Sequence, residues 1–189
     1  MGTFTEPTLL PGLKSEINPG GGLEVRNFSV AAQVIATAAR DFVDGSQLLV
    51  PASGLKVGSK IKFVLDITKT AAGTASAVFD ISFGTDGDVN DTARVSFTKI
   101  AGTAAVDVAR VVIEATVRSV SATGVVVGKF TLTHNLLDTG FSTLPAGNVV
   151  TISSGFDNDG QELFIGLNIT TGASDVWTVQ VVEASLTGV

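Results

Sequence analysis

Residues 60–67 largely alternate between apolar and polar side chains, and this pattern constrains the fold more than any other feature of the chain. The apolar and polar sets are Ile61, Phe63, Leu65 and Ile67 against Lys60, Lys62 and Asp66. A period of two is typical of a strand with one face buried and the other in water. Because variants of the pattern recur to the C-terminus with almost no helical periodicity between them, the sequence predicts an all-β sandwich.

The other predicted strands come at regular intervals with turn chemistry between them. They cover residues 48–50, 77–84, 93–98, 110–119, 126–133, 149–153, 163–169 and 176–184. Segment 23–39 is rich in helix-forming alanine, but its β-branched residues favour a strand. Eight to ten strands joined by glycine-rich turns fit an antiparallel jelly roll of two sheets, which we expect over residues 23–189.

Residues 1–22 differ in composition and predict an extended N-terminal arm. Three of the five prolines lie before residue 20, and residues 19–22 read Pro-Gly-Gly-Gly, which suits a hinge. A solvated tail is the alternative, but such a tail has little use for four aliphatic side chains. We therefore expect a docking arm that uses Leu9, Leu10, Leu13 and Ile17.

The composition excludes several classes of function. The chain of 189 residues has no cysteine, which rules out disulfides, thiolate metal sites and a catalytic cysteine. Its net charge is -6 and it has no cluster of lysine and arginine, so we expect no nucleic-acid partner. No stretch approaches 18 apolar residues and the first residues do not resemble a signal peptide, so we expect neither membrane insertion nor export.

The chain is unusually apolar, which predicts that partners cover part of its surface. It is 44% hydrophobic and only 16% charged, its mean hydropathy is +0.43, and it holds eleven phenylalanines and one tryptophan. Trp177 would offer a platform for a sugar ring if it faced solvent. We favour the core or a subunit interface for it, and expect the same of Phe130 and Phe141.

Two acidic segments raise the question of a metal. Residues 86–91 alternate oxygen ligands as calcium loops do, but Asp91 stands at the sixth position and Phe97 at the twelfth, where an EF-hand has glycine and glutamate. A polar hairpin is favoured over a looser cation site. Residues 157–160 read as a tight turn. We expect no metal and no cofactor.

No constellation argues for an enzyme. His134 is the only histidine, and although Asp138 and Ser142 lie near it in sequence, that is not the geometry of a triad. A histidine at the end of a strand, with a half-buried and hydrogen-bonded ring, is the commoner arrangement. We expect no catalytic residues.

Eight motifs carry a resemblance to a known group of proteins. In the first half they are Lys69-Thr70-Ala71-Ala72-Gly73-Thr74-Ala75, Phe79-Asp80-Ile81, Phe83-Gly84-Thr85 and Asp91-Thr92-Ala93-Arg94. In the second half they are Gly124-Val125-Val126-Val127-Gly128, Thr133-His134-Asn135-Leu136, Thr139-Gly140-Phe141 and Gly172-Ala173-Ser174-Asp175-Val176-Trp177-Thr178. Together they resemble structural proteins of tailed bacteriophage virions over about residues 45–186.

The resemblance implies a jelly-roll subunit on the outside of the phage head, made in the host cytoplasm. The kind it implies is a capsid decoration (cement) or head-fibre protein, in which homotrimers are usual, with the phage major capsid protein as partner. The arm would then grip neighbouring capsid subunits. The alternative is a tail-fibre or receptor-binding module, in which loops such as 86–91 or 157–160 contact a glycan of the host surface.

Overall fold

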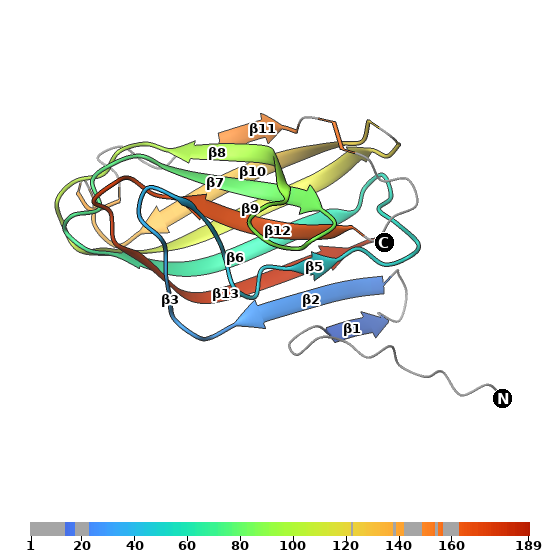
Figure 1. The fold of residues 1–189 in the computed structure, drawn as a ribbon, viewed down its shortest axis with the longest axis horizontal. Helices are drawn as coiled ribbons and strands as arrows, with labels where there is room; N and C mark the ends of the chain where they lie inside the picture. The colour runs from blue at the N-terminus through green and yellow to red at the C-terminus, as the bar shows by residue number, and fades with distance from the viewer. Residues whose placement is uncertain are drawn as a thin grey trace.

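The computed structural model describes residues 14–17, 23–121, 123–137, 139–141, 149–153, 155–156 and 163–189. Every regular element within them is a strand, and the strands form two antiparallel sheets packed face to face (Figure 1). The expected all-β class and two-sheet sandwich are therefore confirmed. These residues include no helix long and apolar enough to cross a membrane.

The larger sheet has the order β1-β2-β13-β6-β9-β10-β11, and the short β3 also pairs with β13. Its bounds are β1 Lys14–Ile17, β2 Leu23–Ser29, β3 Gln33–Val34, β6 Lys60–Lys69, β9 Asp107–Ser119, β10 Val125–His134, β11 Val149–Ile152 and β13 Trp177–Thr187. The strand predicted from residues 60–67 is thus β6, which lies between β13 and β9. Its alternation matches its burial, since Ile61, Phe63, Leu65 and Ile67 are each at most 2% exposed.

The smaller sheet has the order β4-β12-β7-β8, and the short β5 also pairs with β12. Its bounds are β4 Arg40–Phe42, β5 Leu48–Leu49, β7 Ala77–Gly84, β8 Thr92–Lys99 and β12 Phe164–Thr170. β7 and β12 are buried on both faces, because segments before β6 and after β7 cover the outer side.

The finer expectation of a jelly roll stays a prediction, and it can be compared with the neighbours of each strand in the sheets. β2, β13, β6 and β9 lie side by side in the larger sheet, while β4, β5, β7, β8 and β12 form the other layer. The first and last long strands are therefore neighbours, and the chain passes repeatedly between layers, as in sandwiches built from Greek keys. β10 and β11 extend the larger sheet beyond β9.

Aromatic rings from both layers meet in the core. Phe79 of the smaller sheet lies 5.0 Å from Phe130 and 6.0 Å from Trp177 of the larger one, measured between ring centroids. Phe141 meets Trp177 edge to face at 5.1 Å. Trp177, Phe130 and Phe141 are at most 2% exposed in the single chain. Of the two sites expected for them, core or subunit interface, they occupy the core.

The N-terminal region is described only at residues 14–17. These form β1, which pairs antiparallel with β2 and places Ile17 opposite Leu23. Leu9, Leu10 and Leu13 lie outside the described residues, as do residues 18–22 of the expected hinge. The division at residue 22 stays a prediction, but β1 adds a strand to the sandwich at this edge.

Segment 23–39 forms β2 and β3, so the strand interpretation is confirmed over the helical one. Turn chemistry also appears where the sequence indicated it. Gly45 of the predicted Asp44-Gly45 turn has a φ of 83°, and a Cβ there would meet the backbone nitrogen of Ser29 at 2.6 Å. The predicted turn at residues 157–160 lies outside the described residues.

Candidate functional site

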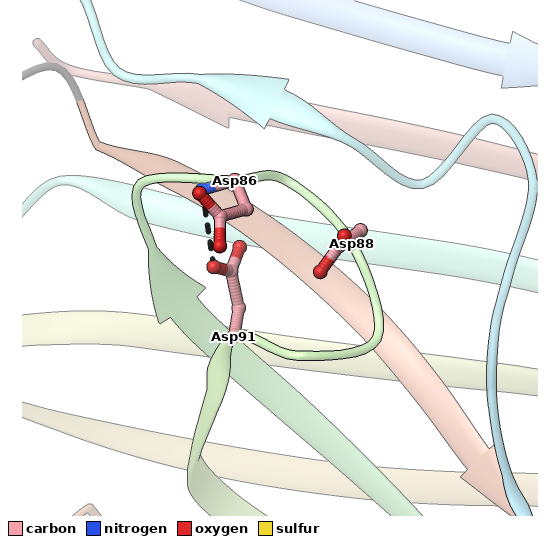
Figure 2. Close-up of side chains that lie close together, drawn as sticks. All are labelled: Asp86, Asp88 and Asp91. Atoms are coloured by element: carbon pink, nitrogen blue, oxygen red, sulfur yellow. Dashed lines mark hydrogen bonds between the residues drawn. The ribbon is translucent and has the colours of Figure 1, made fainter.

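The acidic loop, residues 85–91, joins β7 to β8 and gathers three aspartates (Figure 2). One carboxylate oxygen from each of Asp86, Asp88 and Asp91 lies within 4.8 Å of the others. Oxygen ligands so spaced suit a divalent cation. These are the residues that the sequence offered for a looser cation site.

Hydrogen bonds within the loop already employ all three carboxylates, since Asp86 accepts from the hydroxyl of Thr85 at 3.4 Å. Asp91, which is 5% exposed, accepts from the backbone N–H groups of Asp86 and Gly87 at 3.2 and 2.8 Å. Asp88 accepts from the backbone N–H of Asn90 at 2.7 Å. The aspartates thus close a polar hairpin by satisfying its backbone donors, which is the interpretation that the sequence favoured.

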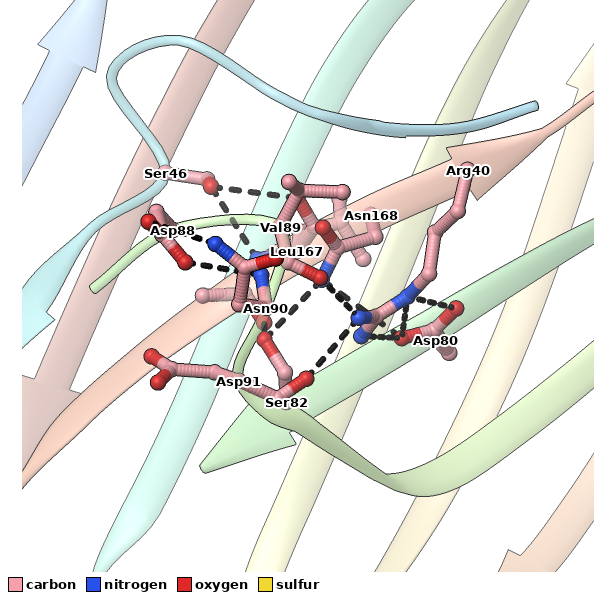
Figure 3. A network of polar contacts seen from close by, with 11 residues as sticks. Arg40, Ser46, Asp80, Ser82, Asp88, Val89, Asn90, Asp91, Leu167 and Asn168 are labelled. Carbon is pink, nitrogen blue, oxygen red and sulfur yellow. Dashed lines mark hydrogen bonds and ion pairs between the residues drawn. The ribbon is translucent and has the colours of Figure 1, made fainter. Parts of the chain in front are cut away.

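The acidic loop is tied to the smaller sheet by an arginine (Figure 3). The guanidinium of Arg40, from β4, lies 2.6 Å from the carboxylate of Asp80 on β7. It also donates to the backbone carbonyls of Val89 and Asp91. Because Asp80 is only 3% exposed, the loop and the arginine together keep its charge paired in a buried place.

The same network continues across β7 and β12. The Nδ2 of Asn168 donates to the hydroxyl of Ser82 at 2.9 Å, and the hydroxyl of Ser46 accepts from the backbone N–H of Leu167 at 3.0 Å. Asn168, Ser82 and Ser46 are fully buried. The network fixes the acidic loop on a rigid base, and within the described residues it leaves only the Asn168 Oδ1 without a partner.

A groove of about 400 Å³ lies on the outer face of the larger sheet, where β2, β13 and β6 run side by side. Along it, Phe28 stands opposite Glu183, and Arg26 opposite Ser185. Lys62 continues the second of these rows on β6. Phe28 is 52% exposed, so an aromatic face lies in reach of solvent among charged side chains. Sequence alternation alone did not single out this aromatic residue.

Ion pairs follow the strands beyond the groove. The guanidinium of Arg110 forms two hydrogen bonds of 2.8 and 2.9 Å with the carboxylate of Asp66. This contact lowers the pKa of Asp66 and raises the pKa of Arg110. Both side chains are largely exposed, so the pair adds little stability, but it makes this face of the sheet charged and wet.

His134 ends β10, where the sequence placed a half-buried and hydrogen-bonded ring. Its Nδ1 lies 2.9 Å from the carboxylate of Asp107, and the two side chains are 9% and 0% exposed. Asp107 also accepts from the backbone N–H of Phe141 at 3.0 Å. Asp138 and Ser142 lie outside the described residues. The pair thus joins the end of β10 to the start of β9.

Two lysines are buried at the same end of the sandwich. Lys69 donates to the carbonyls of Thr103 and Ala105 at 2.7 and 2.6 Å, and burial lowers its pKa. Lys99 lies 5.9 Å from the ring of Phe141 and 5.8 Å from that of Trp177. Burial, and secondarily the charge of Lys69, lowers the pKa of Lys99 to about 8.

Sequence reasoning missed these polar groups. Every second residue of β6 and of the greater part of β8 points into the core, and Lys69 and Lys99 fall on these inward positions. The alternation of each strand could therefore have predicted that both lysines are buried. The pairs Arg40–Asp80 and Asp107–His134 gave no such signal, because their members lie 40 and 27 positions apart in the sequence.

Comparisons with known proteins identify no family. No protein-family model and no curated protein matches the chain. A solved lectin from Bauhinia forficata in complex with GalNAc is 12% identical, with 87% of this chain and 99% of that chain covered and a TM-score of 0.40. Arcelin-5, a lectin-like defense protein from Phaseolus vulgaris, is 9% identical, with 88% of this chain and 99% of that chain covered and a TM-score of 0.40. These distant likenesses go no further than the β-sandwich, and neither points to a phage protein.

Proposed function

We propose that the protein is a structural component of a tailed-phage virion without catalytic activity: a trimeric decoration protein that binds the outside of the head. The motifs at residues 69–94 and 124–178 support this through their resemblance to virion proteins. The sandwich with its strand-anchored N-terminal segment is an architecture suited to such a role. The partner is the major capsid protein.

The structural observation behind the proposal is the position of β1. Four residue pairs tie residues 14–17 to β2 at the edge of the larger sheet. An arm that includes Leu9, Leu10 and Leu13 therefore starts from a fixed point of the sandwich. Three such arms on one trimer would act at a high local concentration, which strengthens modest contacts by a factor of about 100 to 10,000.

A truncation that keeps β1 tests the arm. A variant lacking residues 1–13, and a second with Leu9, Leu10 and Leu13 changed to alanine, are mixed with heads that lack the protein, and binding is measured by co-sedimentation. We expect both variants to lose most of the binding while keeping the melting curve of the full chain. Undiminished binding by both would refute the arm.

Copy number tests the location. We expect quantitative mass spectrometry of purified virions to find hundreds of copies, as a head surface requires. A handful of copies would instead indicate the tail.

A glycan-binding module is the second candidate, and the groove beside Phe28 favours it. An exposed aromatic ring stacks on the apolar face of a sugar, and neighbouring charged and hydroxyl groups, here Arg26, Glu183 and Ser185, bond its hydroxyls. The test is binding to a glycan array. If this function holds, Phe28→Ala removes the signal and Val57→Ala, an exposed change outside the groove, does not.

A further inference from the structure

Five chain segments meet at one end of the sandwich, which lies at the left in Figure 1. We call them the loop cap: residues 31–39, 70–76, 100–106, 135–141 and 171–176, apart from residue 138, which is not described. Backbone and side-chain hydrogen bonds connect neighbouring segments: Gly102 N–H to Thr74 O at 2.9 Å, Thr103 N–H to Gly140 O at 2.8 Å, Thr70 N–H to Val176 O at 3.0 Å and Thr171 Oγ1 to Ala36 O at 3.2 Å.

The described residues of the loop cap present no charge to solvent. Alanine, glycine, threonine, valine, isoleucine and leucine dominate its composition. The single charged side chain among them, Asp175, is 1% exposed. Lys69, Lys99 and Asp107 lie directly beneath the loop cap and are at most 3% exposed. These four charges are therefore turned inward.

Large apolar side chains stand out from the loop cap instead. The exposed fractions are 65% for Val34, 45% for Ile100, 69% for Val106, 93% for Leu137 and 41% for Val176. Single exposed apolar residues are ordinary, but five of them on interlocked and uncharged loops form a surface suited to association.

The rest of the described surface differs in carrying charged side chains beside its exposed apolar ones, which are Phe28, Val30, Val57, Val108 and Ile152. The outer face of the larger sheet carries the ion pairs Asp66–Arg110 and Lys62–Glu114, and the acidic loop lies away from the loop cap (Figure 1). A partner that brought charges against the loop cap would lose their hydration and find no counter-charge, at a cost of several kcal/mol for each. A fitting partner is itself uncharged and apolar, as the loop cap is.

We propose that the loop cap is the surface through which copies of this chain associate with one another. Among their described residues, two caps brought together cover no exposed charge, and the net charge of -6 on each chain keeps its acidic parts apart. The hydrogen bonds between the loops, and those from Lys69 to Thr103 and Ala105, hold the cap in place before contact. Little ordering entropy is then lost on binding.

The expected affinity is modest. Covering the five exposed side chains on both copies favours association, but the loss of translational and rotational freedom opposes it by a free energy of similar size. We therefore expect dissociation constants in the micromolar range or above, and an affinity that does not fall as salt rises, because no ion pair is made.

Two matched substitutions test the proposal in the full-length chain. Val106→Glu places a charge in the loop cap, and Val57→Glu places one on an equally exposed valine near the opposite end, since Val57 is 66% exposed. Sedimentation equilibrium from micromolar to near-millimolar concentration should show that the wild type and Val57→Glu associate equally, and that Val106→Glu associates at least about tenfold more weakly. Leu137→Asp should repeat this loss, and the fluorescence of Trp177 reports whether each variant is folded.

A wild type that stays monomeric over this range, or folded cap variants that associate as Val57→Glu does, would overturn the proposal. The inference shares with the proposed function only the expectation of an oligomer. Loss of head binding with intact self-association would count against the decoration role alone. A monomer that still binds heads would count against the loop cap and against the proposed trimer, but not against binding to the head.

Discussion

Lys99 is buried where an ammonium group is costly, and this makes stability depend on pH in an unusual direction. Its side chain is 3% exposed, packed between Phe141 and Trp177, and burial lowers its pKa from 10.5 to about 8. Between pH 8 and 10.5 the folded chain has released this proton, whereas the unfolded chain still holds it. Because the unfolded state binds more protons, the free energy of unfolding rises with pH across this window.

The magnitude follows from the size of the shift. Each pKa unit is worth about 1.4 kcal/mol, so the shift from 10.5 to about 8 sets a ceiling of about 3 kcal/mol. Water that reaches the end of the side chain lowers the cost of burying the ammonium group. We therefore expect the charged Lys99 to destabilise the folded chain by about 2 kcal/mol at pH 7. Lys99→Met removes the ammonium and also the hydrogen bond to the carbonyl of Ile100, which is worth about 1 kcal/mol. At pH 7 the variant should therefore be about 1 kcal/mol more stable than the wild type.

Urea unfolding followed through the fluorescence of the single tryptophan, at several values from pH 7 to 10.5, measures this directly. The chain has neither tyrosine nor cysteine, so lysines and the α-amino group are what titrates in this window. The advantage of Lys99→Met over the wild type should vanish or reverse by pH 10.5. Lys129→Met, at an exposed lysine of β10, should run parallel to the wild type. A constant difference between Lys99→Met and the wild type over the whole range would refute the reasoning.

Two further substitutions probe the packing and the polar network. Arg40→Met leaves the buried carboxylate of Asp80 unpaired and should lower the free energy of unfolding, measured in urea, by about 3 to 5 kcal/mol. The double variant Arg40→Met with Asp80→Asn should recover part of this stability. An equal loss of stability in the single and the double variant would contradict a buried ion pair. Gly128→Ala places a Cβ 2.6 Å from the ring of Phe97 and should lower stability by about 1 to 3 kcal/mol, and an unchanged melting temperature would show that the two sheets can move apart there.

The strands could be predicted from sequence because their signal is local. The segment predicted at residues 77–84 is β7 itself, and residues 60–67 cover most of β6. In both, neighbouring side chains alternate between the core and the other face, so a few residues suffice to reveal the pattern. The order of the strands could not be read in this way. β2 pairs with β13, which lies about 150 residues further along the chain, and nothing local in either strand specifies that partner.

The polar contacts were harder to foresee for the same reason. Asp80 meets Arg40 across 40 positions of sequence, and Asp107 meets His134 across 27. The hydrogen-bonded state of His134 was predicted from the usual behaviour of such residues, but its partner was not. The acidic loop was the reverse case, since its three aspartates lie within six residues and their proximity follows from the loop itself.

The two lysines beneath the loop cap, Lys69 and Lys99, point inward because the alternation of inward and outward side chains continues to the last residue of β6 and of β8. Had either strand turned one residue earlier, Lys69 or Lys99 would have ended its strand on the outer side, and the end of the sandwich would carry exposed ammonium groups. Instead Lys69 donates inward to the carbonyls of residues 103 and 105, which stabilises the loop whose outer side presents Ile100 and Val106. Lys69→Met should therefore loosen residues 100–106, and hydrogen exchange of their amides should quicken while that of the acidic loop stays unchanged. Equal exchange in both proteins would show that the loop cap is held by its backbone hydrogen bonds alone.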